Sequence, residues 1–494
     1  MGRGGHRGRG AGRADARRGP GADSRSRGAP DPARTVALET LTKVRRDDAF
    51  ANLVLPALLD REGLSGRDAG FATALTYGTL RLQGRYDAVL TRCVDRPLEE
   101  VDGPVLDVLR LGAHQLLAMR VPRHAAVWAT VDLAAHALGR GAASFVNAVL
   151  RRVSALYAQE WLDRLRREAP DATAALAQVE SHPQWVVKAM RQALVSCGRG
   201  VEELPALLGA DNVDPEVALC ARPGLISPEA LVKEAASALG GEPRPGATSP
   251  CAVVLTGGDP GRLASVRRGR AGVEDEGSQL VALLLAEAGL EGRDERWLDM
   301  CAGPGGKAAL LGARAAQRGA RLVATEIAPH RVRLLESAVR ALPPGTVEVR
   351  QGDARDAGSQ EPGAYDRVLL DAPCSGLGSL RRRPEARWRR RPADVTELAE
   401  LQRELLASAL RAVRRGGVVA YVTCSPHVLE TSLVVGDVLK RLAREGLEAE
   451  LLHAGDAATR VAPRPPAGAE RQMLQLWPHL DGTDAMFCAL LRRT

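Results

Sequence analysis

Residues 297–311 read WLDMCAGPGGKAALL. An apolar run ends at Asp299, three glycines follow at 303, 305 and 306, and the next segment places its apolar residues at helical spacing. A strand, a glycine-rich turn and a helix in this order are typical of the first unit of a doubly wound α/β domain. Glycines let the backbone approach a ligand closely while the helix N-terminus faces it. The stretch therefore predicts a ligand site at the carboxyl ends of parallel strands.

The same pattern continues to the end of the chain. From about residue 271, strand-like runs alternate with helical segments, which predicts a mostly parallel sheet with helices on both faces. We expect the strands in the runs RWLDM, RLVATE, VEVRQ, YDRVLLDAP and GVVAYVTCS, with DAMFCALLRRT as a last, antiparallel strand. The fold class of residues 271–494 is therefore expected to be α/β and Rossmann-like.

The glycine loop matches neither of two common nucleotide motifs. A P-loop requires glycine where the chain has Cys301 and a hydroxyl where it has Ala308, and Ala308 also replaces the last glycine of a dinucleotide fingerprint. The loop is therefore expected to serve a ligand with little or no phosphate.

Carboxylates stand at three later strand ends. Glu326, 23 residues after Gly303, is placed to accept hydrogen bonds from ribose hydroxyls, and Asp353 suits an adenine amino group. S-adenosylmethionine fits this arrangement, with its sulfonium near Asp299 and Asp371. Each acid alone is equally well explained as a helix cap. The hypothesis of an S-adenosylmethionine site therefore depends on all of these acids occurring together at strand ends.

Two cysteines follow the ends of the last two parallel strands. Cys374 and Cys424 should converge on one cleft if those strands are neighbours. A thiolate that adds to carbon 6 of cytosine makes carbon 5 nucleophilic, which is covalent catalysis. Nearby cations or helix N-termini favour the thiolate, and Asp371 is placed to protonate cytosine N3. Spacing alone leaves open which cysteine attacks.

The motifs WLDMCAGPGGK, RVLLDAPCSGLG, VTCSPHVLE and VEDEGSQL resemble those of the RNA cytosine-5 methyltransferases, most closely the bacterial Sun/RsmB type. The resemblance implies an enzyme that methylates small-subunit ribosomal RNA, with Cys424 as nucleophile and Cys374 assisting product release. It also implies that Lys307 lines the cytosine pocket. The cofactor-binding residues that it implies are Cys301, Ala302, Gly303, Pro304, Gly305, Gly306, Lys307, Glu326, Asp353 and Asp371.

The chain departs from the family pattern at two positions. Thr431 follows Glu430 where the family usually has asparagine, and Gly303 stands where the loop often has alanine. Neither change removes a catalytic atom, but Thr431 is expected to alter a secondary hydrogen bond.

Three segments precede the α/β domain. Residues 1–33 form a Gly/Arg-rich tail that we expect to be disordered, either contacting phosphates or simply solvated. Residues 34–160 show helical periodicity throughout and resemble a NusB-like RNA-binding domain. Residues 161–270 mix helix and strand signals, which predicts a small α/β linking module.

Composition limits the class of protein. The eight cysteines form no CxxC pair, so we expect no structural zinc and no other metal. They are too sparse for a disulfide scaffold, so we expect a reducing, cytoplasmic environment. No run of 18 apolar residues indicates a membrane span. The expected partner is RNA, and the expected state is a monomer.

An arginine-dense loop follows the first active-site cysteine. Seven arginines surround Trp388 between residues 381 and 391, which favours contact with RNA phosphates and stacking on a base. Two alternatives to the enzyme remain open. One is a non-catalytic RNA-binding or ribosome-assembly factor, and the other is a redox switch through a Cys374–Cys424 disulfide.

Overall fold

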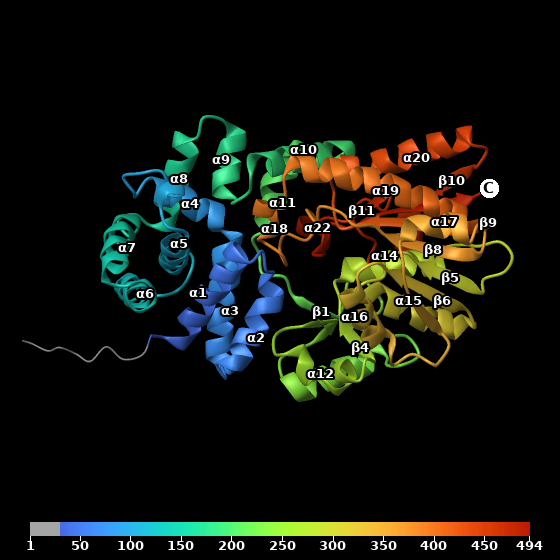
Figure 1. Cartoon of the computed structure of the whole chain (residues 1–494), viewed down its shortest axis with the longest axis horizontal. Helices are drawn as coiled ribbons and strands as arrows, with labels where there is room; N and C mark the ends of the chain where they lie inside the picture. The colour runs from blue at the N-terminus through green and yellow to red at the C-terminus, as the bar shows by residue number, and fades with distance from the viewer. Residues whose placement is uncertain (1–29) are drawn as a thin grey trace, which may run out of the picture.

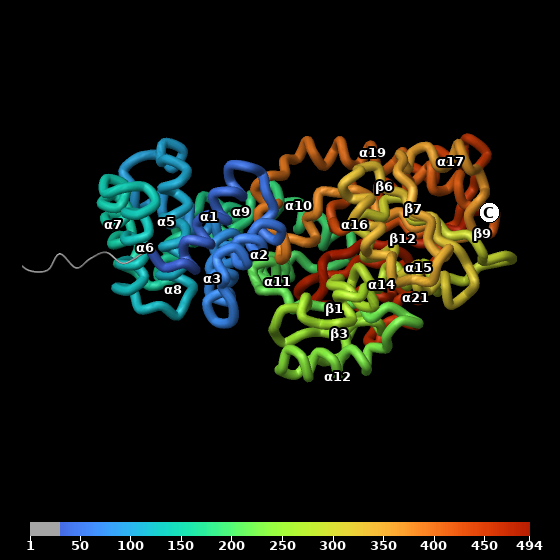
Figure 2. Tube along the Cα trace, turned by 60° about the horizontal axis from the view of Figure 1, so that its bottom comes forward, coloured from blue at the N-terminus to red at the C-terminus, as the bar shows by residue number. Residues whose placement is uncertain are grey.

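The computed structural model describes residues 30–494 (Figure 1). Most of the predicted basic tail therefore lies outside the described residues. Helices α1–α9 occupy one end of the molecule and the large C-terminal sheet the other, an arrangement that Figure 2 shows from a second direction. None of the helices within residues 30–494 is long and apolar enough to cross a membrane.

The N-terminal part is a helical bundle. Its first helix begins at Pro32, where the Asp31 side chain accepts a hydrogen bond from the backbone N–H of Arg34 and so caps the helix. Fully buried leucines from α3, α4, α5 and α7 form its core. The helices are α1 (Pro32–Arg46), α2 (Ala51–Arg61), α3 (Gly66–Arg81), α4 (Gln83–Thr91), α5 (Gly103–Leu117), α6 (Arg123–Leu138) and α7 (Arg140–Val153).

The middle of the chain has two parts. Four helices come first: α8 (Ala158–Glu168), α9 (Ala172–Val179), α10 (Gln184–Ser196) and α11 (Leu204–Ala210). A small antiparallel sheet of order β2-β3-β1-β4 follows, covered by α12 (Pro228–Leu239). Its strands are β1 (Val217–Ala221), β2 (Arg244–Pro245), β3 (Ala252–Leu255) and β4 (Ala271–Val273).

The C-terminal sheet has the order β10-β12-β9-β8-β5-β6-β7, with β11 beside β12. The five strands from β9 to β7 are parallel and β12 is antiparallel to β9, as predicted, whereas β10 and β11 were not expected. The strands are β5 (Arg296–Asp299), β6 (Arg321–Glu326), β7 (Val347–Gln351), β8 (Tyr365–Asp371), β9 (Val413–Thr423), β10 (Ala449–Leu452), β11 (Leu474–Gln475) and β12 (Phe487–Arg493).

Helices cover both faces of this sheet. Trp297 and Leu369 point to the face packed by α14 and α15, and their neighbours Leu298 and Val368 point to the face packed by α19 and α20. Because both faces are buried, the central strands are apolar at nearly every position. The covering helices include α14 (Glu276–Glu287), α15 (Gly306–Arg318), α16 (Pro329–Val339), α19 (Pro392–Ala412), α20 (Ser432–Arg444) and α21 (Ala454–Val461).

The order of the strands decides where a ligand can bind. From β5 the chain proceeds outward through β6 and β7, then returns to place β8 and β9 on the other side of β5. A crevice at the carboxyl edge of a doubly wound sheet forms at such a reversal. The glycine loop after β5 and the segments after β8 and β9 therefore meet at one place.

The arginine-dense loop joins the two ends of the molecule. Arg387 is fully buried and donates hydrogen bonds to the backbone oxygens of Arg81, Ser181 and Asp211. Arg381 is also buried, and its backbone oxygen accepts a hydrogen bond from Arg81. The prediction that this loop faces RNA is therefore wrong for Arg381 and Arg387. Backbone oxygens of residues 81, 181 and 211 bind the Arg387 guanidinium, and the Arg381 guanidinium binds Asp484 and the backbone oxygen of Gly482.

Candidate active site

Two cysteine sulfurs meet at the carboxyl edge of the sheet. Asp371 at the end of β8 is in register with Val422 of β9, so the chain leaves both strands at the same level. The Sγ atoms of Cys374 and Cys424 lie 3.3 Å apart, each side chain half-buried. The expected convergence of the two strand ends is thus present.

The environment distinguishes the two thiols. The hydrogen bond from Cys374 lowers the pKa of Cys424, with help from the ammonium group of Lys307. The same hydrogen bond, together with burial, raises the pKa of Cys374 well above its ordinary value. The pair therefore favours a thiolate at Cys424 that receives the S–H of Cys374.

Lys307 is half-buried at this edge and points to the site rather than to solvent. Its Nζ lies 2.9 Å from Asp371 Oδ2 and 3.3 Å from Ser278 Oγ, and 14% of its side chain is exposed. Burial lowers the pKa of Lys307, but the carboxylates of Asp371 and Glu274 outweigh it and hold the pKa above its ordinary value. A permanent cation therefore stands beside the two sulfurs.

A buried carboxylate fixes both cysteine loops from behind. Glu430 is fully buried and accepts hydrogen bonds from Ser375 N at 2.7 Å, Ser375 Oγ at 2.5 Å and Ser425 Oγ at 2.6 Å. Gln402 Nε2 of α19 is a fourth donor at 3.3 Å. Since Ser375 and Ser425 directly follow Cys374 and Cys424, one anion sets the relative position of the two thiols.

This role of Glu430 was not predicted from the sequence. The only signal was its place in the motif that follows Cys424. Thr431 beside it donates from Oγ1 to the backbone oxygen of His427 at 3.1 Å and so closes the short turn Val428–Glu430. The unusual threonine therefore makes a local hydrogen bond and leaves the carboxylate in place.

A cavity of about 330 Å³ opens between the ends of β5, β6 and β7, and Pro373, the residue before Cys374, is part of its wall. Glu326 is 3% exposed, and its carboxylate accepts hydrogen bonds from Gly303 N at 3.2 Å and Ala328 N at 2.9 Å. Asp353 also lines the cavity and is hydrogen-bonded to Arg355. The further lining residues are Met300, Cys301, Ile327, Arg331, Gly352, Ala354, Leu401 and Leu405.

The loop next to this cavity requires its glycines. A Cβ at position 303 would lie 2.3 Å from Glu326 Oε2. Gly305 has φ +113°, and a Cβ there would lie 2.6 Å from the Cβ of Ala338. Gly303 in place of the alanine common in the family therefore lets the Glu326 carboxylate approach the backbone.

Asp299 completes the acidic set behind the loop. It is 1% exposed, and neither carboxylate oxygen has a hydrogen-bond partner among the described residues. Burial raises the pKa of Asp299 to about 8. A buried acid without a partner beside a ligand cavity suits a cationic ligand group. Within residues 30–494, no group of three or more His, Cys, Asp or Glu residues is arranged to hold a metal ion.

Comparisons with known proteins agree with this site. Residues 289–492 match the family model of the 16S rRNA methyltransferase RsmB/F, and residues 31–155 match the NusB family. The Mycobacterium tuberculosis protein Rv1407, named only as a methyltransferase, is 48% identical over 464 residues, which cover 94% of this chain and 97% of that protein. A Bacillus subtilis protein named "Probable ribosomal RNA small subunit methyltransferase B" is 30% identical over 462 residues, covering 93% and 98%.

One solved structure shares nearly the whole fold. The crystal structure of PH0851 aligns with a TM-score of 0.75 and covers 94% of this chain and 99% of its own, at 20% identity. The sequence matches, the helical N-terminal bundle and the paired cysteines at the sheet edge lead to one assignment. The chain belongs to the RsmB/F family of S-adenosylmethionine-dependent RNA cytosine-5 methyltransferases, with a NusB domain at its N-terminal end.

Proposed function

We propose that this enzyme forms 5-methylcytosine in 16S ribosomal RNA through a transient bond between Cys424 and carbon 6 of the target cytosine. The observation that supports it most directly is the 3.3 Å approach of two thiols at the sheet edge that also carries a half-buried lysine–aspartate pair. The relative from Bacillus subtilis carries small-subunit ribosomal RNA in its name, which supports this RNA as the substrate.

The cavity and its acids fit S-adenosylmethionine. Glu326 would hold the ribose hydroxyls, and Asp353 would face the adenine. The unpartnered carboxyl group of Asp299 would face the cationic methionine part, whose charge would favour its ionised form. The backbone of residues 301–307 would follow the ligand, since glycines let a backbone approach a ligand closely. The bound cofactor supplies an electrophilic methyl group.

The first chemical step belongs to the residues at the sheet edge. The Cys424 thiolate adds to carbon 6 of cytosine, and the displaced electron pair makes carbon 5 nucleophilic. N3 must gain a proton as the adduct forms. Asp371 delivers this proton to N3, and the Lys307 ammonium, 2.9 Å from Asp371, keeps its charge and stabilises the carboxylate that is left.

The second step restores the free enzyme. After the methyl group is bonded to carbon 5, the original proton on carbon 5 must leave. The bond between carbon 6 and sulfur then breaks, and N3 returns the proton that it gained in the first step. Once Cys424 is bonded to carbon, Cys374 loses its main hydrogen-bond acceptor, which is the largest cause of its raised pKa. Cys374 can then lose its proton and act as the base at carbon 5.

The experiment compares two serine variants. Cys424→Ser should abolish methyl transfer, measured by bisulfite sequencing of the RNA, without forming adducts. Cys374→Ser should accumulate enzyme–RNA adducts that survive a denaturing gel. Cys197→Ser, a half-buried cysteine after α10, is the matched control and should behave like wild type. Adducts in Cys424→Ser and none in Cys374→Ser would mean that the two roles are reversed.

The two alternatives have separate tests. A non-catalytic RNA-binding factor would show no S-adenosylmethionine binding in calorimetry. A disulfide switch requires that oxidant suppress activity and reductant restore it, so equal rates under both conditions would dismiss it.

A further inference from the structure

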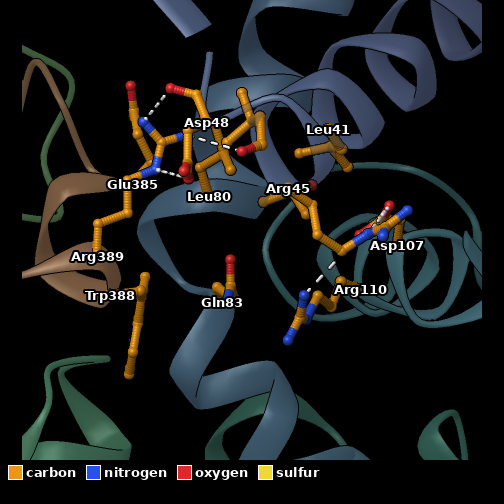
Figure 3. A pocket seen from close by; sticks show the side chains of 12 residues that line it. Leu41, Arg45, Asp48, Leu80, Gln83, Asp107, Arg110, Glu385, Trp388 and Arg389 are labelled. Carbon is orange, nitrogen blue, oxygen red and sulfur yellow. Dashed lines mark hydrogen bonds and ion pairs between the residues drawn. The ribbon is translucent and has the colours of Figure 1, made fainter. Parts of the chain in front are cut away.

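A second cavity lies where the helical domain meets the catalytic domain (Figure 3). Its volume is about 240 Å³. Residues from α1, α3 and α5 of the helical domain line one side, and residues at α18 (Ala386–Arg389) of the catalytic domain line the other. Neither the cofactor cavity nor the two active-site sulfurs form part of it.

Three polar groups around this cavity lack hydrogen-bond partners. Glu385 is 3% exposed, and its Oε1 accepts from the backbone N–H of Ala51 at 3.2 Å while its Oε2 has no partner. The indole Nε1 of Trp388 is also buried and unpartnered. The Gln83 side chain, which Figure 3 shows between the two walls, is half-buried and makes no hydrogen bond within residues 30–494. Since buried polar groups are nearly always satisfied, the two buried groups, Glu385 Oε2 and Trp388 Nε1, indicate a ligand in this cavity.

Apart from Glu385, the charged side chains that line the cavity are already paired. Arg45 pairs with Asp107 at 2.8 Å, Arg389 lies 3.7 Å from Asp48, and Arg110 pairs with Asp87 at 2.6 Å. A phosphate would have to compete with these carboxylates, and a cation with these guanidinium groups. The cavity therefore suits a neutral polar ligand with donors on one part of its edge and an acceptor on another.

We propose that this cavity binds an unpaired guanine base of the RNA substrate, at a distance from the target cytosine. Guanine carries two adjacent donors, N1–H and N2–H₂, that match the free carboxylate oxygen of Glu385, and its O6 accepts from an N–H such as that of Trp388. Splayed-out bases in RNA are read in this way, by hydrogen bonds to their edges beside an aromatic ring.

The position of α18 connects the cavity to the chemistry. Arg390, directly after α18, donates to the backbone oxygen of Ser375 at 3.2 Å, next to Cys374. The segment that would hold the guanine is therefore followed by a residue that is hydrogen-bonded to the loop of Cys374. A base held here would fix the RNA relative to the cleft. This inference rests on the proposed RNA substrate, but its test measures binding without methyl transfer.

The test compares guanosine and inosine 5′-monophosphates, which differ by the exocyclic amino group. Binding to the full-length protein is measured by saturation-transfer NMR and calorimetry, with saturating S-adenosylhomocysteine to block the cofactor cavity. We expect the guanosine nucleotide to bind about tenfold more tightly than the inosine nucleotide, the discrimination typical of one paired base edge.

Two matched variants locate the effect. Glu385→Gln keeps an acceptor for Ala51 but loses the carboxylate, so it should reduce the preference for guanosine to about twofold or less. Glu99→Gln, on the exposed surface of the helical domain, should keep the full preference. Trp388→Phe keeps a ring but removes the indole N–H and should weaken both nucleotides.

Equal binding of the two nucleotides to the wild-type protein, or no binding at millimolar concentrations, would overturn the proposal and mean that the cavity holds water only. If Glu385→Gln does not fold, judged by thermal melting, the wild-type comparison still decides. Wild-type methyl transfer through Cys424 combined with equal binding would reject this inference and leave the proposed function intact.

Discussion

Removing the Glu430 carboxylate should separate the loop of Cys374 from the loop of Cys424. The carboxylate is fully buried and accepts three hydrogen bonds of 2.5–2.7 Å from Ser375 and Ser425. Leaving a buried donor without an acceptor costs about 1–3 kcal/mol. The hydroxyls of Ser375 and Ser425 can turn to new partners, but the backbone N–H of Ser375 cannot. Glu430→Ala should therefore destabilise the protein by about 3–6 kcal/mol, or about 10 °C or more in Tm.

The effect on catalysis should exceed the effect on cofactor binding. A displacement of about 1 Å at a reacting group can lower a rate about 100-fold, whereas Glu430 contributes nothing to the cavity that Glu326 and Asp353 line. In single-turnover methyl transfer from labelled S-adenosylmethionine, Glu430→Gln should lose about 100-fold in rate and keep its cofactor Kd within about twofold.

The matched control is Glu450→Gln. Glu450 lies on β10 of the same domain, and its half-exposed side chain pairs with Arg492. It should keep the wild-type rate and Tm. The reasoning is refuted if Glu430→Ala melts within about 1 °C of wild type and methylates RNA at the wild-type rate, because the carboxylate would then set neither stability nor the thiol geometry.

Three further predictions follow from groups in the site and at the domain interface. Lys307→Ala should move the pH dependence of Cys424 adduct formation upward, because the hydrogen bond from Cys374 remains but the cation that also lowers the Cys424 pKa is lost. Asp299 binds a proton more tightly in the folded state, with a pKa of about 8, so its contribution to stability falls as pH rises from about 4 to 8. Asp299→Asn should therefore stabilise the ligand-free protein by about 2–4 kcal/mol at pH 7, with no gain near pH 4, in melts across that range. Arg387→Ala should cost about 3–5 kcal/mol in denaturant unfolding because it leaves buried carbonyls unpaired, and Arg391→Ala, 80% exposed, should cost less than about 0.5 kcal/mol.

Several features of the fold could be predicted from the order of the residues alone. Strand-like runs and helical runs alternate after residue 271, and apolar residues fill the strands because both faces of the sheet are buried. The edge strand β10 escaped prediction because its burial alternates only weakly, and β11 because it is two residues long. Both depend on pairing with β12, which local periodicity does not reveal.

The sequence by itself determined the chemistry available at the sheet edge: a glycine loop, strand-end acids and two cysteines after neighbouring strands. Only the tertiary structure decided how the pKa values of the two thiols differ, since that depends on a 3.3 Å contact and on Lys307, which is 117 residues before Cys424 in the chain. It also decided that Arg387 holds two domains together, because its partners come from residues 81, 181 and 211. Periodicity reports what lies along one strand or helix, whereas charge and hydrogen bonding are set by residues that meet only after the chain has folded.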